Sequence, residues 1–233
     1  MYQNRLVLCF ILARGSSKGL PRKNVLMLAG KPLIAHSIDV AKNVKYIDKI
    51  YVSTEDNEIK EIALRFGASV IDRPPELATD SAIALDSLKH MIQSIPNATK
   101  ENPIVVWFHV TSPIREIVDV EKCIEMFDSE TDCVVSVGEM KIHPSYAMTL
   151  KNGILSYYLD IPRMANRQES EPLYFLNGSV VVTDCKFLLN QKRIPIGGRM
   201  KGFVMDEKHS TDIDSRLEFE FCKFIMENGK SII

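Results

Sequence analysis

Four cations gather in a short polar stretch near the start of the sequence, LARGSSKGLPRKN, which spans residues 12–24. Arg14, Lys18, Arg22 and Lys23 occur there without a single acidic residue, among glycines and serines. Small residues let a backbone turn its N–H groups toward a ligand, and several converging cations suit an anion with many oxygens. The stretch therefore predicts a phosphate-binding loop.

The spacing of this loop excludes two common phosphate motifs, because neither GxxxxGK[ST] nor GxGxxG is present. A solvated basic loop would explain the charge, but not its position directly behind an apolar run. Gly15 and Gly19 are expected to give the ligand access to the backbone. Cations beside a departing pyrophosphate stabilise the transition state, so we expect a triphosphate substrate and a divalent metal. Arg22 receives no role and is expected to face solvent.

Two aspartates near the other end of the sequence, Asp212 and Asp214, are candidate metal ligands. In an extended segment, side chains two residues apart point the same way and can share one Mg²⁺. Asp214 also precedes an apolar helical pattern, so helix capping and metal binding are both open on spacing alone. Arg73 is open in a similar way, since it could read a base edge or pair with Glu76.

Composition places these residues in an ordinary globular chain. The 29 basic and 30 acidic side chains nearly cancel, which argues against nucleic acid or an anionic membrane as a partner. The five cysteines are widely spaced without a CxxC pair, as expected for buried reduced thiols. No stretch approaches the roughly 20 apolar residues that span a bilayer. We expect a cytoplasmic protein that binds no nucleic acid and no membrane.

The elements that must position the site follow from the apolar pattern. Short apolar runs alternate with amphipathic helices, which predicts a doubly wound α/β fold with a mostly parallel sheet. In such sheets, ligands bind beyond the carboxyl ends of the strands, where the cationic loop leaves the first strand. The predicted strands are residues 6–12, 49–53, 69–71, 104–110, 133–137 and 179–183. The predicted helices open at Pro32, at Asp56, at Thr79 or Asp80, and at Thr111–Pro113.

The alternation breaks over residues 139–172, where a hairpin-like insertion fits better than another strand and helix. Residues 1–138 and 173–233 would then form one α/β domain. The insertion is too short to cover its own apolar side chains, such as Met148, Leu150 and Ile154. Closed two-fold dimers are the commonest oligomers, so we predict a homodimer formed through this insertion. The alternative is a flap that packs on its own domain.

Several motifs together resemble the nonulosonate cytidylyltransferases, the family of the CMP-N-acetylneuraminate (CMP-sialic acid) synthetases. The resemblance covers nearly the whole chain. The motifs, in the family's order, are LARGSSKGLPRKN, VSTEDNEI, RPPELATD, HVTSPIR, the Asn177–Gly178 pair and HSTDIDSRLE. The resemblance implies a nucleotidyltransferase of Rossmann-like fold that joins CTP to the anomeric hydroxyl of a nonulosonic acid and releases pyrophosphate, with Mg²⁺ as cofactor.

The resemblance also implies roles for individual residues. Arg14, Lys18 and Lys23 would hold the phosphates, and Asn24 and Arg73 would help to hold the nucleotide. Asp212 and Asp214 would bind Mg²⁺.

The implied reaction is direct attack of the sugar hydroxyl on the α-phosphorus, without a covalent enzyme intermediate. Arg14, Lys23 and Asp214 would be the catalytic residues, with Asp214 accepting the hydroxyl proton. Arg167, in the insertion, would meet the acceptor carboxylate across the dimer interface.

Departures from the sialic acid enzymes fall on the sugar side. His109 replaces the usual glutamine before ThrSerPro, Tyr146 an expected lysine and Phe175 an expected arginine. With Arg167, His109 and Phe175 are the expected sugar contacts. Aromatic surface in place of polar groups favours a less hydroxylated acceptor, so legionaminic or pseudaminic acid competes with N-acetylneuraminic acid.

Three other functions stay open at this stage. A sugar nucleotidyltransferase with another nucleotide or sugar would share the fold, and a glycosyltransferase could use the aspartate pair. A catalytically dead nucleotide-binding module is the third, although Lys23, Asp212 and Asp214 are all present.

Overall fold

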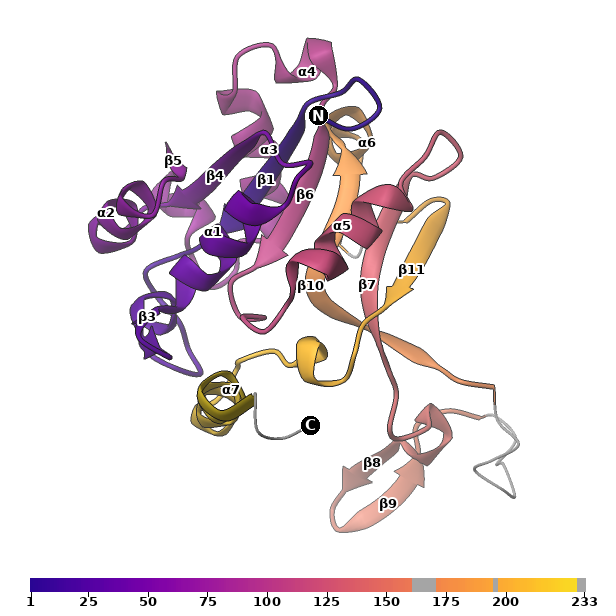
Figure 1. Ribbon diagram of the computed structural model, residues 1–233. Helices are drawn as coiled ribbons and strands as arrows, with labels where there is room; N and C mark the ends of the chain where they lie inside the picture. Colours follow the sequence, from indigo (N-terminus) through magenta and orange to yellow (C-terminus); the bar gives the residue numbers. More distant parts are fainter. Residues whose placement is uncertain (161–170, 195–196, 230–233) are drawn as a thin grey trace.

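The computed structural model describes residues 1–160, 171–194 and 197–229 and builds them around a seven-stranded sheet (Figure 1). Every neighbouring pair of strands is parallel except those of β10, which runs antiparallel to both β6 and β7. The predicted mostly parallel sheet is confirmed. In order across the sheet, the strands are β11 (Met200–Val204), β7 (Cys133–Glu139), β10 (Tyr174–Asp184), β6 (Ile104–His109), β1 (Val7–Leu12), β4 (Lys49–Thr54) and β5 (Ser69–Asp72).

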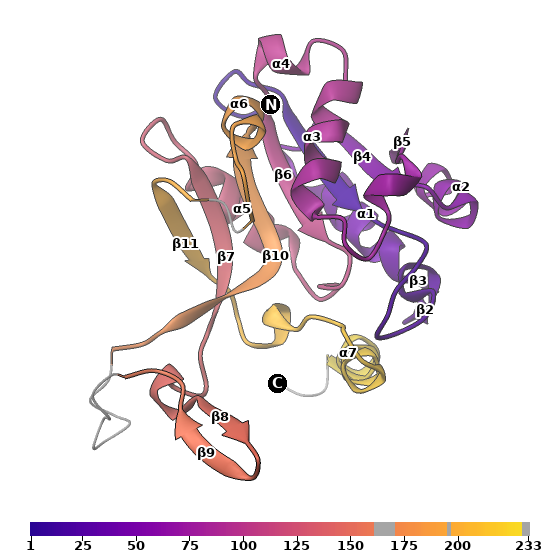
Figure 2. The same ribbon diagram turned by 180° about the vertical axis from the view of Figure 1, so that it is seen from behind.

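Helices cover both faces of the sheet, as the doubly wound class requires (Figures 1 and 2). Four of them pack on one face: α1 (Leu33–Asn43), α2 (Asn57–Arg65), α5 (Ile117–Glu125) and α7 (Arg216–Asn228). The other face is covered by α3 (Ala84–Ser94), α4 (Ala98–Glu101) and α6 (Cys185–Leu189).

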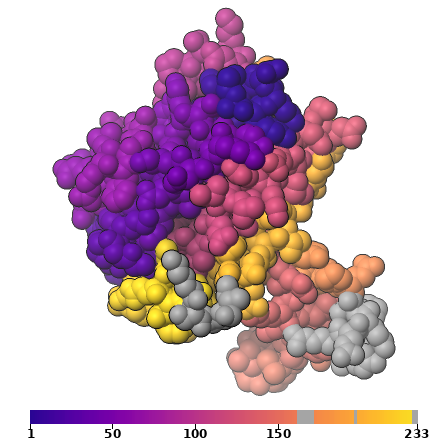
Figure 3. Space-filling view, viewed as in Figure 1, coloured from indigo at the N-terminus to yellow at the C-terminus, as the bar shows by residue number. Residues whose placement is uncertain are grey.

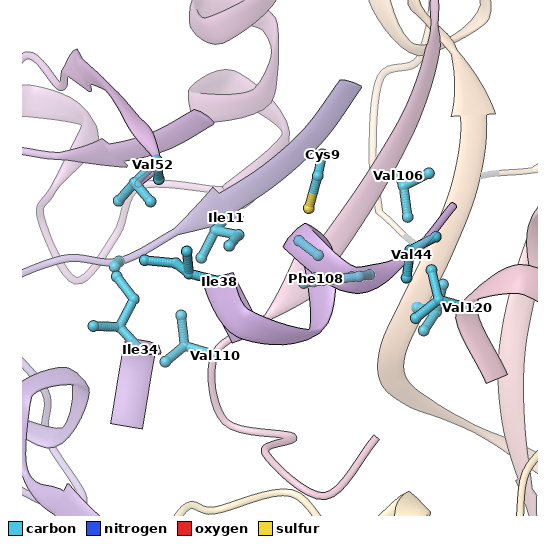
Figure 4. Close-up of a cluster of buried hydrophobic side chains, with 14 of the residues drawn as sticks. Cys9, Ile11, Ile34, Ile38, Val44, Val52, Val106, Phe108, Val110 and Val120 are labelled. Atoms are coloured by element: carbon cyan, nitrogen blue, oxygen red, sulfur yellow. The ribbon is translucent and has the colours of Figure 1, made fainter. Parts of the chain in front are cut away.

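The central strand β1 is buried on both faces, which explains its unbroken apolar sequence. Cys9 and Ile11 point into the first helical layer, where they lie among side chains from α1 and β6 (Figure 4). Leu8 and Phe10 point into the second layer. All four are at most 2% exposed, so the loop that follows β1 leaves a rigid base.

The chain reverses direction across the sheet next to β1. It runs outward from β1 through β4 to β5, and then returns to β6 on the other side of β1. Leu12 and His109 pair at the carboxyl ends of β1 and β6. A crevice beyond such a reversal is the usual ligand site of an open α/β sheet.

Two predicted helix starts are wrong. The helix expected at Thr111–Pro113 begins at Ile117, because Glu116 and Asp119 form a capping box there. The helix expected at Thr79 or Asp80 begins at Ala84, and Asp80 pairs with cations instead. The start at Asp56 is confirmed, since its side chain accepts a hydrogen bond from Ile59 N.

The sequence patterns also missed the edge strand β11 and most of the length of β10. β11 follows a charged stretch and shows no strong apolar alternation. β10 begins at Tyr174, well before the predicted strand, and contains a β-bulge between Leu176 and Val181. β10 starts with the exposed apolar residues Tyr174, Phe175 and Leu176, but Asn177 and Gly178 interrupt the apolar run before the buried part of the strand.

The insertion contains a two-stranded hairpin that projects from the body (Figure 3). Strands β8 (Met148–Lys151) and β9 (Ile154–Tyr157) are joined by Asn152 and Gly153, both at positive φ. Asn-Gly is a favoured sequence for a tight hairpin turn. Elsewhere, a small hairpin of β2 (Met27–Leu28) and β3 (Lys31–Pro32) precedes α1. Across the described parts of the chain, none of the helices is long and apolar enough to cross a bilayer.

Candidate active site

A cavity of about 320 Å³ opens beside the carboxyl ends of β1 and β6. The cationic loop forms one wall, and the segment that leads into α3 forms another. Four of the five residues assigned to the nucleotide line it directly, namely Arg14, Lys23, Asn24 and Arg73, and His109, which was assigned to the sugar, lines it as well. The cavity therefore gathers residues that are far apart in the sequence, as the switch point predicts.

Lys23 joins the cationic loop to the aspartate segment. Its side chain is only 11% exposed, and Nζ donates to the main-chain oxygen of Ile213 at 2.5 Å and to Asp214 Oδ1 at 3.1 Å. The next residue, Asn24, donates from Nδ2 to the main-chain oxygen of Arg14 at 2.8 Å. These contacts close the loop and hold its basic end against the acidic segment.

The two loop glycines allow the loop to pack closely against other parts of the chain, rather than exposing backbone N–H groups to a ligand. A Cβ on Gly15 would lie 2.6 Å from Asp56 Oδ2, and one on Gly19 would lie 2.2 Å from the main-chain oxygen of Asp214. The N–H of Gly15 donates to Glu55 Oε1 at 2.7 Å. The expectation that Gly15 offers its N–H to a ligand is therefore wrong, because a carboxylate already takes it.

The expectation that Arg22 only faces solvent is also wrong. Its guanidinium donates to Asp56 Oδ2 at 2.5 Å and Oδ1 at 3.2 Å, and it pairs with Glu58. These contacts raise the pKa of Arg22 above its ordinary value. The residue points toward the start of α2 and away from the cavity.

Arg14 and Lys18 share one carboxylate. Asp80 lies 3.0 Å from Arg14 Nη1 and 3.2 Å from Lys18 Nζ, and Arg14 also donates to the main-chain oxygen of Thr79. Lys18 is 75% exposed and stands at the rim of the cavity, whereas Arg14 lines it. Asp80 thus provides the internal counter-charge that an incoming anion must replace.

Arg73 is buried beside the cavity, with 6% of its surface exposed. Nη2 donates to the main-chain oxygen of Ser53 at 2.7 Å, and Nε donates to Ser53 Oγ at 3.1 Å. Burial lowers the pKa of Arg73 from its usual value. Of the two open alternatives, the cavity-facing position favours ligand contact over a surface pair with Glu76.

The segment that contains Asp212 and Asp214 has carboxylates available to hold a cation. The cap of α7 is Ser215, in a capping box with Glu218, so Asp214 is free of that structural task. Asp212 Oδ1 is buried and has no hydrogen-bond partner among the described residues. Burial is also the main cause that raises the pKa of Asp212.

Two hard carboxylates beside a phosphate site match the way proteins hold Mg²⁺, which keeps several waters and takes substrate oxygens as well. A cation would also relieve the orphaned oxygen of Asp212. Within the described ranges, no group of three or more acidic, histidine or cysteine side chains is arranged so that it alone could hold a metal ion. The donor set thus fits a shared protein–substrate ion.

His109 contacts the cavity from the end of β6. Its ring packs on that of Trp107 at an interplanar angle of 49°, with centroids 4.6 Å apart, and a Cβ on Gly178 would lie 2.7 Å from His109 Nδ1. Burial, followed by the charge of Arg115, lowers the pKa of His109 to about 4. The ring is therefore neutral near pH 7.

Arg115 is a structural cation that the sequence reading did not assign. Its guanidinium is 3% exposed, stacks over Phe108, and bonds to Ser179 Oγ, Ser37 Oγ and the main-chain oxygen of His109. Burial lowers its pKa to about 10. Sequence patterns did not reveal the roles of Arg115 and Asp80, because Arg115 also bonds to the distant Ser37 and Ser179. Asp80 likewise pairs with Arg14 and Lys18, which lie far from it in sequence.

The predicted sugar-side residues are not brought together by the described chain. Phe175 lines a second hollow of about 1000 Å³, between the insertion and β11, whereas His109 lines the first cavity. The bulge of β10 separates them, with Gly178 against His109 and Asn177 Nδ2 donating to Ser210 Oγ at 3.0 Å. Arg167 lies outside the described residues.

Comparison with known proteins was made on both sequence and fold. A family model described as Cytidylyltransferase matches residues 8–178. An N-acylneuraminate cytidylyltransferase of Streptococcus agalactiae serotype V (strain ATCC BAA-611 / 2603 V/R) is 37% identical over 91% of this chain and 51% of its own. The chain thus spans about half the length of that relative.

A relative of similar length is the CMP-N,N′-diacetyllegionaminic acid synthase of Legionella pneumophila subsp. pneumophila (strain Philadelphia 1). It is 29% identical over 95% of this chain and 96% of its own. Among solved structures, a CMP:2-keto-3-deoxy-manno-octonic acid synthetase complexed with CTP superimposes with a TM-score of 0.73 at 18% identity. It covers 96% of this chain and 99% of its own, and the likeness shows a shared fold.

Proposed function

The chain belongs to the cytidylyltransferase family, and on that premise we propose that it transfers the cytidylyl group of CTP to the anomeric hydroxyl of a nonulosonic acid. One observation carries the proposal. Lys23 lines the cavity of about 320 Å³ and links the cationic loop to the carboxylate of Asp214, which lies just outside the lining. Cations for the leaving group and a carboxylate for the attacking hydroxyl thus meet in one place.

The cationic loop would bind the triphosphate of CTP and stabilise the pyrophosphate as it leaves. Arg14 and Lys23 line the cavity, and Lys18 can reach a terminal phosphate from the rim. Charge develops on the pyrophosphate as it leaves, and fixed cations in a partly enclosed site stabilise that charge. Asn24 and Arg73 would hold the rest of the nucleotide against the ends of β1 and β4.

Asp212 and Asp214 would hold the Mg²⁺ that we propose as cofactor. When bound, the ion would neutralise phosphate charge and align the α-phosphate. Lys23 Nζ lies 3.1 Å from Asp214 Oδ1, so the lysine and the ion would both place positive charge beside the phosphates.

The reaction requires one bond to form, one to break and one proton to leave. The acceptor hydroxyl oxygen would bond to the α-phosphorus while the bond from that phosphorus to the bridging oxygen breaks, which releases pyrophosphate. Asp214, whose side chain is 78% exposed, would accept the hydroxyl proton. His109 is neutral in the working pH range and would orient a ligand by hydrogen bonding.

The acceptor would be a nonulosonic acid with few hydroxyls on the side that faces Phe175. That ring is 42% exposed in the second hollow, where an apolar or acylated substituent could pack. The likeness to a CMP-N,N′-diacetyllegionaminic acid synthase along the whole chain supports a deoxy acceptor. The higher identity to an N-acylneuraminate cytidylyltransferase supports N-acetylneuraminic acid.

The protein would act as a homodimer through the insertion. Large apolar side chains of the hairpin are well exposed in the single chain, including Leu150 at 66%, Ile154 at 69% and Leu155 at 59%. A second copy could cover them, and it would bring the insertion of one subunit, with Arg167, toward the acceptor side of the other.

A substrate panel tests the proposal directly. Pyrophosphate release is measured with CTP, UTP, ATP and GTP against N-acetylneuraminic, legionaminic, pseudaminic and 2-keto-3-deoxy-octonic acids, with and without Mg²⁺. We expect release only with CTP, a nine-carbon acid and Mg²⁺, and kcat/KM highest for a deoxy acid. If pyrophosphate were released with UTP, ATP or GTP but not with CTP, the cytidylyl assignment would be refuted. If N-acetylneuraminic acid were turned over better than legionaminic and pseudaminic acids, the preference for a deoxy acid would be refuted.

A further inference from the structure

Arg22 turns away from the cavity that the other loop cations face. It has a φ of 56°, in the left-handed region that non-glycine residues rarely adopt. Arg14 and Lys23 line the cavity, whereas the lining does not include Arg22. A strained backbone position next to Lys23 calls for surrounding contacts that hold it in place.

Those contacts come from one acidic corner, formed by Glu55, Asp56 and Glu58 at the start of α2. Arg22 donates to both carboxylate oxygens of Asp56 and pairs with Glu58, and such bidentate pairs fix geometry as well as charge. Asp56 is itself held as the cap of α2, accepting from Ile59 N at 3.0 Å. The guanidinium is thus anchored to a helix rather than to a mobile surface group.

The same corner holds the other end of the loop. Gly15 donates its N–H to Glu55 and packs so closely on Asp56 that a side chain would not fit. The main-chain oxygen of Gly15 is 3.5 Å from Arg22 Nη1. Gly15 and Arg22, near the two ends of the loop, therefore meet at the start of α2. Lys18 lies between them in the sequence, and Arg14 and Lys23 flank them.

We propose that Arg22 and Asp56 are a positioning pair that pre-organises the phosphate loop, so that Arg14 and Lys23 face CTP before it arrives. The proposal rests on the proposed function. Like-charged side chains in an unliganded loop repel one another, and a tether on its outer side would keep them converged. A site organised in advance loses less free energy when the ligand binds.

A competing possibility is that Arg22 leaves Asp56 and binds a phosphate itself. The two possibilities predict opposite signs for removal of the Asp56 charge. If Arg22 binds phosphate, Asp56→Asn frees the arginine and removes a repelling carboxylate, so CTP binds more tightly. If the pair positions the loop, Asp56→Asn weakens CTP binding although it removes negative charge near the site.

The experiment measures CTP affinity without relying on turnover. Trp107 is the chain's single tryptophan and lines the cavity, so its fluorescence can report CTP binding in the absence of an acceptor. The variants are Arg22→Asn, Asp56→Asn and the double variant. Asparagine tolerates the left-handed conformation at position 22 and keeps a helix cap at position 56. Lys60→Gln, which breaks the Lys60–Asp72 pair elsewhere on α2, is the control.

We expect each single variant to raise the Kd for CTP about tenfold, and the double variant to be no worse than the worse single variant. In steady state, KM for CTP should rise while KM for the acceptor stays the same. Lys60→Gln should stay within about twofold of the unaltered chain. Arg22→Lys should recover part of the loss, because it keeps the charge without the bidentate geometry.

Tighter CTP binding by Asp56→Asn, or losses that add in the double variant, would overturn the positioning role. Equal CTP affinity of all variants would also overturn it. Failure of the unaltered chain to bind CTP would instead refute the proposed function, so the two failures are distinguishable. Thermal unfolding of each variant identifies any that has lost its fold, and Arg22→Lys then carries the comparison.

Discussion

Gly19 packs directly on the main-chain oxygen of Asp214, and a Cβ built on the glycine would lie 2.2 Å from that oxygen. The obstacle is backbone, so the chain can accommodate a side chain only if the phosphate loop moves away from the aspartate segment. We predict that Gly19→Ala costs about 1–3 kcal/mol of unfolding free energy and lowers kcat/KM at least about tenfold.

The measurements for Gly19→Ala are urea unfolding and pyrophosphate release. Gly202→Ala is the control, since its added Cβ would meet only Val137 side-chain atoms at 3.6 Å or more. Equal behaviour of the two variants would show that the contact at Gly19 does not matter.

Removal of the Lys23 amine should abolish most of the activity. We predict that Lys23→Ala lowers kcat about a hundredfold, because a fixed cation beside the leaving group is lost. Lys18→Ala, at the exposed rim, should cost less and act mainly on KM for CTP. Single-turnover kinetics with saturating CTP separate the two effects, and near-normal turnover of Lys23→Ala would contradict its assigned role.

Loss of either aspartate charge should weaken the binding of Mg²⁺ without unfolding the protein. We predict that Asp212→Asn and Asp214→Asn each lower turnover by about two orders of magnitude and raise the Mg²⁺ concentration needed for half-maximal rate. Asp212→Asn should keep or increase the unfolding free energy, because burial already disfavours that charge. Glu220→Gln, on the exposed side of α7, is the matched charge-removal control. An unchanged Mg²⁺ requirement in both aspartate variants would exclude them as ligands.

His109 should make the fold sensitive to acid. Its pKa falls from about 6.5 in the unfolded chain to about 4 in the folded one. Between these values the unfolded chain binds the extra proton, so folded-state stability is present above pH 6.5 and is lost as the pH falls toward 4. The loss is at most about 3 kcal/mol.

His109→Gln removes this titration. We predict that its unfolding free energy falls less steeply between pH 6.5 and pH 4 than that of the unaltered chain, measured by urea titration at each pH. Identical slopes would show that His109 is not held neutral by its surroundings.

The hairpin should control the oligomeric state. We predict that Leu150→Lys combined with Ile154→Lys halves the molar mass observed by light scattering, because charges would replace exposed apolar contacts. Leu64→Lys is the control, since Leu64 is 60% exposed on α2 in the body of the protein. A monomeric unaltered chain would contradict the proposed dimer at once.

The sequence allowed prediction of the fold class and most of the sheet, because buried strands such as β1 and β6 have unbroken apolar runs. It did not allow prediction of β11, which is short and has no buried residue, or of the early part of β10, where Asn177 and Gly178 interrupt the apolar run. The start of α5 was misplaced because Thr111–Pro113 imitates a cap, while Glu116 and Asp119 form the real one.

For the site, the sequence predicted which residues take part better than it predicted which residues they contact. The cationic loop was evident from composition, whereas the separation of 190 residues between Lys23 and Ile213 hides their contact from any local pattern. The opposite orientations of Lys23 and Arg22, which are adjacent in sequence, depend on a backbone conformation that side-chain type does not reveal.

The insertion leaves and rejoins the sheet at a single point. Glu139 and Tyr174 are partners across β7 and β10, and Met140 N donates to the main-chain oxygen of Leu173 at 2.8 Å. A segment whose two ends are already paired can lengthen, shorten or change sequence at little entropic cost to the rest of the chain. The nucleotide site and the insertion can therefore evolve as separate modules. For the same reason, a two-residue turn that joins β7 directly to β10 is a practical way to engineer the α/β domain without the insertion.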